Sequence, residues 1–434
     1  YTVPLLDLER IEVLKGTQGV LFGKNTIAGV INTVSKSPVI GGDLDAYISQ
    51  ELVNDWSTNK LNMATNIPVN DNFAIRVALS SNESDGWVDN AFTNEQEPQT
   101  KSEAIRATFL YELDDMEINL KVFKSDSERI GQHSQVTHWG LSAPPPSIIA
   151  AGRTVAVAAF SIANAAFPQL AQNVGKDFTS TNSMKIYGSQ NPNGGTNDAE
   201  NMILNIKTTA NDHDLSWTST MSEYDFTEGA DADMSPLDFL SVSGNEQYES
   251  TTHELVITSP SSDTFEYIAG FFIEETEYSF QNEAFLNGDL GNAPVTNAVL
   301  TNALGIGGTL WNAFSRGGLP ANVLSSHHIH DLETSSQSVF AEGTWYLNDQ
   351  LSLTAGVRWS DEEKELMDSQ FLGSDLSSGN TIQAASTDNN RIVRNILFGV
   401  LGRDRYEFPL QKMAEDHITP SVKINYQYSD TTSM

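Results

Sequence analysis

The sequence contains no cysteine among its 434 residues, and this absence excludes disulfides, thiolate metal sites and cysteine nucleophiles. Basic residues are also scarce, because 24 lysines and arginines stand against 57 aspartates and glutamates, for a net charge of -33. Binding to nucleic-acid phosphates needs an excess of lysine and arginine. The composition therefore excludes a nucleic-acid partner.

Long apolar runs are missing as well. The nearest candidate for a membrane-spanning helix, residues 147–167, carries Arg153, Ser161 and Asn164, and this polarity favours helical turns packed within a loop. No signal peptide opens the chain, because Tyr1 already resembles the interior of a domain. The start and the end both look cut, so we expect the chain to be a fragment of a longer protein.

Catalytic motifs are absent too. Gly16, Gly19 and Gly23 precede Lys24, but the spacing of a phosphate-binding loop fails at Gln18. The sequence has no His-Glu-x-x-His and no Gly-x-Ser-x-Gly segment. We therefore predict a protein that is not an enzyme and that uses no cofactor.

What the chain does contain is apolar–polar alternation with a period of two, in segments of about ten residues. In one segment, Phe73, Ile75, Val77 and Leu79 share a face, and Arg76 lies on the opposite one. An unbroken apolar face of this length suits a tilted strand that crosses a bilayer, whereas charge on the other face suits a wet lumen. About twelve segments show the pattern: Asp43–Leu52, Thr58–Ile67, Asn72–Asn82, Lys101–Leu113, Met116–Ser125, Glu200–Thr209, Asp214–Phe226, Glu249–Thr258, Thr264–Ser279, Gln337–Leu347, Gln350–Glu365 and Asp416–Tyr428.

The connections between these segments alternate in length. Short turns are expected at Pro68–Asp71, Asp114–Asp115, Asn211–His213, Ser259–Asp263 and Asn348–Gln350, and long connections after Asp85, Ser127, Thr227, Phe280 and Met367. Tight turns at one end and long loops at the other are typical of an outer-membrane barrel. We therefore predict an all-β fold, an antiparallel transmembrane β-barrel, of which this chain supplies about 12 of the roughly 22 strands that a plugged barrel needs.

The opening stretch, Leu8–Lys36, differs from the rest by its dense glycines. Ile11 and Val13 predict a short strand, and Val30, Ile31 and Val34 predict a second one. The glycines between them allow sharp reversals and close backbone approach. The residues alone therefore predict a compact, tightly turned β unit.

As a pattern, this stretch resembles the latter half of the plug domain of TonB-dependent outer-membrane receptors, in which IERIEVLKG, LFG and GVIN recur almost unchanged. Ser338–Lys364 resembles a barrel hairpin of the same family. The resemblance implies the C-terminal part of a plug domain in residues 1–38 and a partial β-barrel with long extracellular loops in residues 39–434. It also implies the outer membrane of a Gram-negative bacterium, with outer-membrane lipid around the barrel.

The family also implies a function. In its members, TonB and its inner-membrane energising complex couple the proton gradient to plug movement, and a ferric siderophore or a similar iron complex then passes through. Haem, cobalamin or a glycan remain alternative ligands, and a passive or structural outer-membrane barrel remains an alternative function. A soluble secreted β-protein is a third hypothesis.

Seven residues match plug positions of the family. They are the charged residues Arg10, Glu12 and Lys15, which the resemblance places against the barrel wall or the periplasm, and the turn glycines Gly16, Gly19, Gly23 and Gly29. Thr17 stands where many members have proline. The segment that contacts TonB is absent from the sequence, and the resemblance assigns no substrate-binding residue.

A histidine-rich tract, His327, His328 and His330 followed by Asp331, is expected at the end of a long loop. Imidazoles are good ligands for zinc, copper or haem iron, but no partner spacing fixes a coordination geometry. A polar loop surface is the alternative. We predict no metal site from the sequence and leave metal or haem binding at these histidines open.

Overall fold

The computed structural model describes residues 5–24, 26, 28–53, 57–91, 93–132, 179–180, 194–231, 240–286, 324–373, 406–429 and 432–433. The predicted helical turns at 147–167 lie outside these ranges. Within them, none of the helices reaches the length and hydrophobicity required to cross a bilayer.

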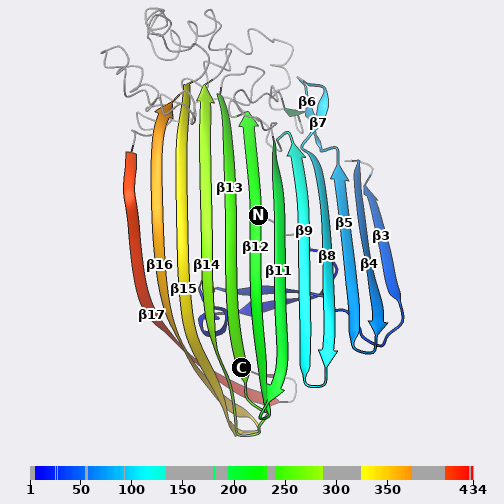
Figure 1. Ribbon diagram of the computed structural model, residues 1–434, viewed down its shortest axis with the longest axis vertical. Helices are drawn as coiled ribbons and strands as arrows, with labels where there is room; N and C mark the ends of the chain where they lie inside the picture. Colours follow the sequence, from blue (N-terminus) through cyan, green and yellow to red (C-terminus); the bar gives the residue numbers. More distant parts are fainter. Residues whose placement is uncertain are drawn as a thin grey trace, which may run out of the picture.

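One curved antiparallel sheet makes up most of the structure (Figure 1). Its 13 strands are the two-residue β18 (Thr432–Ser433) and twelve longer ones. In sheet order, the longer strands are β17 (Tyr406–Ser429), β16 (Leu351–Gly373), β15 (Leu324–Asn348), β14 (Phe265–Leu286), β13 (Leu240–Thr258), β12 (His213–Asp231), β11 (Gly194–Ala210), β9 (Met116–Ile130), β8 (Gln99–Leu113), β5 (Phe73–Ser84), β4 (Thr58–Asn70) and β3 (Asp45–Val53). Each coincides with one of the predicted segments, which confirms the all-β prediction.

Three short strands lie beside the main sheet. They are β6 (Val88–Asn90), β7 (Glu95–Glu97) and β10 (Thr179–Ser180), and they form a separate small sheet. Figure 1 places β6 and β7 at the end of the main sheet opposite its tight turns.

The tight turns gather at one end of the main sheet (Figure 1). Strands β4 and β5, β8 and β9, β11 and β12, and β15 and β16 are each separated by only two residues. The fifth predicted turn joins β13 to β14 through the six residues 259–264. All five predicted short turns are therefore confirmed. The main sheet is open, with β3 and β18 at its two ends.

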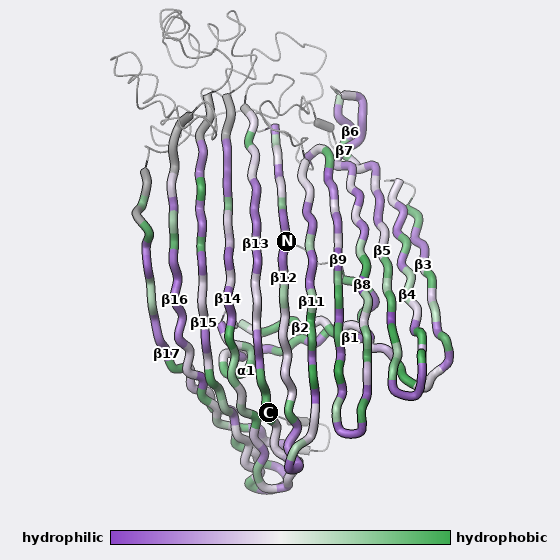
Figure 2. Tube along the Cα trace, in the orientation of Figure 1, coloured by the Kyte–Doolittle hydropathy of each residue, from purple (hydrophilic) through white to green (hydrophobic). Residues whose placement is uncertain are grey.

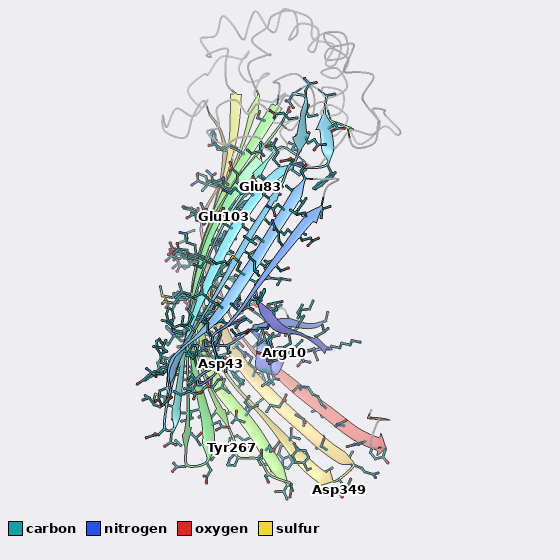
Figure 3. All side chains as sticks on the ribbon, turned by 90° about the vertical axis from the view of Figure 1, so that its right-hand side faces the viewer. Arg10, Asp43, Glu83, Glu103, Tyr267 and Asp349 are labelled. Carbon is teal, nitrogen blue, oxygen red and sulfur yellow. The ribbon has the colours of Figure 1, made fainter. Side chains whose placement is uncertain are left out.

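The chain before β3 forms an N-terminal unit, residues 5–36, on one side of the sheet (Figure 3). It consists of β1 (Leu8–Lys15), the four-residue helix α1 (Gly19–Phe22) and β2 (Gly29–Ser35), and β1 pairs with β2 as an antiparallel hairpin. Both predicted strands are present, and α1 is an addition. We call the face of the sheet that contacts this unit the inner face.

The outer face carries an apolar band near the tight turns, where Figure 2 shows the most hydrophobic strand segments. On β14 the outward residues Phe265, Tyr267, Ala269, Phe271 and Ile273 form one column. This column measures about 26 Å at 3.3 Å per residue, which is comparable with the apolar band of about 25 Å on transmembrane barrels. Beyond Ile273, the outward residues become charged.

The strands run further than the alternation predicted, and the largest extensions are at the end away from the tight turns. For example, β15 begins at Leu324, whereas the pattern predicted Gln337. A ladder of backbone hydrogen bonds needs no apolar face once the strand leaves the hydrocarbon, so polar residues continue the same strands. The connections are correspondingly shorter than predicted.

Six glutamates lie side by side on this outer polar region. The register places Glu200, Glu223, Glu249, Glu277, Glu333 and Glu365 directly opposite one another across β11 to β16, with Lys124 and Lys412 at the two ends. We call these six residues the glutamate row. Lys124 pairs with Glu200 at 2.6 Å and Lys412 pairs with Glu365. Among the described residues, the four central glutamates form no ion pair with a lysine or arginine.

Replacing Glu277 with glutamine is expected to stabilise the barrel by about 0.2–1 kcal/mol, because like charges directly opposite each other in a sheet repel. The gain should shrink as salt is added, since these side chains are exposed and therefore screened. Thermal unfolding at low and high ionic strength measures both effects. Glu200→Gln is the control, because Glu200 already has Lys124 as a partner. A lower melting temperature for Glu277→Gln would contradict the repulsion.

Candidate functional site

The N-terminal unit is held against the inner face by a buried ion pair. Asp7, just before β1, accepts two hydrogen bonds from Arg76 on β5, at 2.7 and 2.8 Å, and one from Arg106 on β8 at 3.2 Å. Arg106 also donates to the carbonyl oxygens of Leu6 and Asp7 at 2.6 and 3.1 Å. The Asp7 side chain is fully buried, and this carboxylate is the shared counter-charge of two guanidinium groups that are themselves almost fully buried.

Two hydrogen-bonded contacts extend this attachment along the same side of the sheet. Lys121 on β9 donates to the Ser35 hydroxyl at 2.7 Å, at the end of β2. Asn66 on β4 exchanges hydrogen bonds of 2.8 and 3.0 Å with the backbone of Val39. Strands β4, β5, β8 and β9 therefore hold both ends of the β1–β2 hairpin.

The tip of the unit, α1, reaches the opposite part of the sheet. Arg358 on β16 donates to the carbonyl oxygen of Val20 at 3.2 Å and to the Ser338 hydroxyl at 2.7 Å. Its guanidinium lies 5.8 and 5.2 Å from the ring centroids of Phe272 and Phe340. These contacts clamp α1 against β14, β15 and β16.

Lys24, just after α1, bridges two carboxylates on the same wall. Its ammonium lies 2.6 Å from Glu274 on β14 and 3.3 Å from Glu362 on β16. Partial burial lowers the pKa of Lys24, but the two carboxylates outweigh burial and raise this pKa above its ordinary value. Lys24 therefore remains a cation between Glu274 and Glu362.

The predicted charged residues of the unit lie on β1 and are exposed. Arg10 pairs with Glu9 at 3.0 Å and with Glu12 at 2.6 Å. Hydrogen bonds from Asn32 and from Arg10 lower the pKa of Glu12. The carbonyl oxygen of Lys15 accepts a hydrogen bond from Gln18. The described contacts of these residues are therefore within the unit.

Each predicted glycine has an identifiable constraint. Gly16 and Gly23 have φ values of +83° and +72°, which favour glycine. A Cβ on Gly23 would lie 3.3 Å from Arg358, and one on Gly19 would lie 3.1 Å from Thr419 on β17. Gly29 is the tightest position, because its Cβ would lie 2.4 Å from the carbonyl oxygen of Leu14.

Gly29→Ala is expected to destabilise the β1–β2 hairpin by about 1–3 kcal/mol, because φ is +149° and the new methyl group would overlap backbone. The measurement is hydrogen exchange of the hairpin amides in the complete receptor. Gly41→Ala serves as a control with a positive φ of +69° but no atom within 4 Å of its Cβ. Equal losses for the two variants would show that steric overlap at Gly29 has no effect.

A cavity of about 500 Å³ separates the tip of the unit from the sheet. Its lining combines aromatic rings with charged groups: Phe22, Lys24, Glu254, Phe272, Glu362 and His417. A second cavity of about 300 Å³ lies on the other side of Gly23, against β17. The N-terminal unit therefore leaves open space beside it, lined by rings and charged groups.

Beyond the cavity, the inner face carries a cluster of rings. Tyr224 on β12 stacks on Tyr248 on β13, with 5.2 Å between centroids. Tyr278 on β14 meets His330 edge-on at 6.2 Å, and the next ring along β14, that of Phe280, meets His328 edge-on at 6.2 Å. We call these six residues the aromatic wall. Stacked and edge-on rings of this kind are well suited to holding a planar or cationic ligand.

The expectation that the histidine tract lies at the end of a loop is wrong. His327, His328 and His330 are inside β15 and pair in register with both β14 and β16. The error arises because the strand continues into water without apolar alternation. His327 bonds Glu283 at 2.8 Å on the outer side, whereas His328 bonds Asp368 at 2.7 Å on the inner side. The three imidazoles therefore do not converge, and no metal-holding group of three or more such side chains occurs among the described residues.

The sequence pattern did not identify the anchoring residues as a site. It placed Arg76 and Arg358 on the polar face of alternating strands, which was the available signal that they face a wet interior. Asp7 gave no signal, because a single carboxylate before a strand has no periodicity. The pairing of Asp7 with Arg76 and Arg106 depends on residues about 70 to 100 positions apart.

A family model described as TonB dependent receptor-like, beta-barrel, matches residues 156–434. The structure is similar to the ferric yersiniabactin uptake receptor FyuA from Yersinia pestis, with a TM-score of 0.65, 14% identity, and coverage of 98% of this chain and 50% of that one.

Two further crystal structures share the fold. The ferric-catecholate import receptor Fiu from E. coli K12, in its open form, matches with a TM-score of 0.57, 12% identity, and coverage of 98% of this chain and 58% of that one. The siderophore receptor PiuA from Acinetobacter baumannii matches with a TM-score of 0.56 and 13% identity, and the match covers 98% of this chain and 52% of that one. The chain thus spans about half the length of the receptors it matches.

Proposed function

Because this chain belongs to the TonB-dependent receptor β-barrel family, we propose that it is part of an outer-membrane receptor for a ferric siderophore or a similar iron complex. The family consists of receptors and transporters rather than enzymes, and its barrels lie in the Gram-negative outer membrane. Uptake would be coupled to the proton-motive force through TonB. The observation that carries the proposal is a glycine-rich unit fixed inside a membrane-type β-sheet by Asp7 and Arg358.

In this proposal, residues 1–38 are plug and residues 39–434 are barrel. Gly16, Gly19, Gly23 and Gly29 shape the plug turns, and Arg10, Glu12 and Lys15 form its charged surface. The outer apolar band would contact outer-membrane lipid. A unit that occupies the inner face speaks against an open passive pore, which was the alternative function.

The aromatic wall is the proposed ligand-contact surface. It lies further from the tight turns than α1, and it combines rings with hydrogen-bonding groups, as small-molecule sites do. Two of the matched receptors are named for the uptake of ferric yersiniabactin and of ferric catecholates, and these names support an iron complex as the class of ligand here.

The test is energy-dependent uptake of radiolabelled ferric complexes by iron-starved cells that express the complete receptor. We expect uptake that stops when the proton gradient is collapsed or TonB is deleted. Iron-independent expression together with no binding of any ferric complex would overturn the iron assignment and leave the barrel fold intact.

Tyr278→Ala is expected to weaken ligand binding about tenfold, because truncating a buried aromatic contact costs more than about 1 kcal/mol at most binding hot spots. Binding of the transported ferric complex to the purified receptor measures the change. Tyr267→Ala is the matched control, since Tyr267 lies on the same strand but on the outer face. Equal affinities for the two variants would remove Tyr278 from the site.

A further inference from the structure

A row of rings and carboxylates crosses the inner face and shares Phe280 and His330 with the aromatic wall. Strand register places Glu246 between Phe226 and Phe280, and Asp368 between His330 and Phe408. Phe280 and His330 are themselves opposite each other, so the row is continuous. Directly opposite residues have Cβ atoms about 5 Å apart, which makes each carboxylate a neighbour of two rings.

Carboxylates outnumber cations on this part of the inner face. From α1 outward, β13 to β17 present Glu246, Glu254, Glu274, Glu362, Asp368 and Glu415, against Lys24, Arg358 and Lys364. The cations are already engaged: Lys24 with Glu274 and Glu362, Lys364 with Glu362, and Arg358 with Val20.

The carboxylates of the row itself have no lysine or arginine partner in the described part of the chain. Glu246 accepts a hydrogen bond from the Tyr224 hydroxyl at 3.4 Å, and Asp368 meets the His328 imidazole at 2.7 Å. Both are partly accessible, so a ligand on the inner face would meet their negative charge. An anionic complex would be repelled there, whereas a cation would gain from the carboxylates and from the ring faces together.

We propose that the iron complex bound by this receptor carries a positively charged group, which a carboxylate of the row, Glu246 beside Phe280 and Tyr278 or Asp368 beside His330, holds against the neighbouring rings. The inference rests on the proposed function, because it names the charge class of that ligand. The matched structures share only the fold, at 12 to 14% identity, and therefore do not determine the charge of the ligand.

The test uses probes that differ in charge. Ferric desferrioxamine B carries a pendant ammonium group, and its N-acetylated derivative has the same iron centre without that charge. Ferric citrate and a ferric tricatecholate serve as anionic probes. Binding to the purified complete receptor in detergent is measured for each, at low and at physiological ionic strength.

We expect the cationic complex to bind best in this set, by about tenfold over its neutral derivative. The double variant Glu246→Gln with Asp368→Asn should remove this preference. The matched control, Glu249→Gln with Glu365→Gln, changes the same net charge on the same two strands but on the outer face, and it should leave the preference unchanged.

Equal binding of the cationic and neutral complexes, tighter binding of an anionic one, or loss of the preference in the outer-face control would each overturn the inference. These outcomes leave the receptor function in place. Failure to bind or take up any of the four ferric complexes overturns the proposed function, and the charge inference with it.

Discussion

Replacing Asp7 with alanine is expected to cost about 3–5 kcal/mol of the free energy that holds the N-terminal unit against the sheet. The carboxylate pairs with both Arg76 and Arg106, whose side chains are themselves only 6 and 7% exposed. Without it, two guanidinium groups remain buried with no counter-charge, and both must either be hydrated or move. Hydrogen exchange of the β1 and β2 amides in the complete receptor measures the lost protection.

The control for Asp7→Ala is Glu9→Ala. Glu9 also pairs with an arginine, Arg10 at 3.0 Å, but both side chains are about half exposed, and such surface pairs contribute about 0–1 kcal/mol. A second variant separates the cost of burying unpaired guanidinium groups from the loss of the Asp7 contacts. Arg76→Met with Arg106→Met in the Asp7→Ala background removes the buried charges and should recover part of the hydrogen-exchange protection of β1 and β2. Full protection in Asp7→Ala alone would mean that the ion pair does not hold the unit.

Replacing Val357 with arginine is expected to destabilise the folded barrel by about 2–4 kcal/mol. Val357 lies on the outer face of β16, in the apolar band, with Ala341 and Pro420 as its neighbours across the sheet. A guanidinium there would stand in hydrocarbon or draw water into it. Guanidinium-chloride titration of the complete barrel in lipid vesicles gives the change in the free energy of unfolding.

Met367→Arg is the matched control. Met367 is on the same face of the same strand, and like Val357 it is 47% exposed, but it lies beyond the apolar band opposite Asp331. An arginine at 367 is therefore expected to be neutral or slightly stabilising. If both substitutions cost the same, the outer face does not change from lipid to water between residues 357 and 367.

The strands could be predicted because burial in lipid imposes a period of two on one face, and this period is visible residue by residue, as in Phe73 to Leu79. The ends of the strands far from the tight turns could not be predicted, because beyond Ile273 or Trp359 most outward residues are polar. The alternation stops there while the backbone pairing continues. His327, His328 and His330 were misplaced for this reason.

The composition of the site depends on which residues lie opposite one another in neighbouring strands, and the sequence alone does not show this register. Glu246 and Asp368 are far apart in the chain and join one row only because the pairing of β13 to β16 keeps one register along this part of the sheet; the shift in β15–β16 lies at Tyr346 and Asn348, beside the tight turn. The Lys24 bridge to Glu274 and Glu362 likewise needs the hairpin tip to reach across the lumen. The glycines, in contrast, were visible locally, since a positive φ at Gly16 and Gly23 is a property of a few neighbouring residues.

The glutamate row has a consequence for how deep the molecule sits. If the barrel sank towards the tight turns, the carboxylates of Glu249, Glu277 and Glu333 would enter hydrocarbon on adjacent strands at once. If it rose, the apolar side chains at the far edge of the band, Phe271, Val339 and Trp359 on adjacent strands, would emerge into water together. Both displacements raise the free energy steeply, so the barrel can occupy only a narrow range of positions along the membrane normal. The height of the aromatic wall above the bilayer is fixed with it.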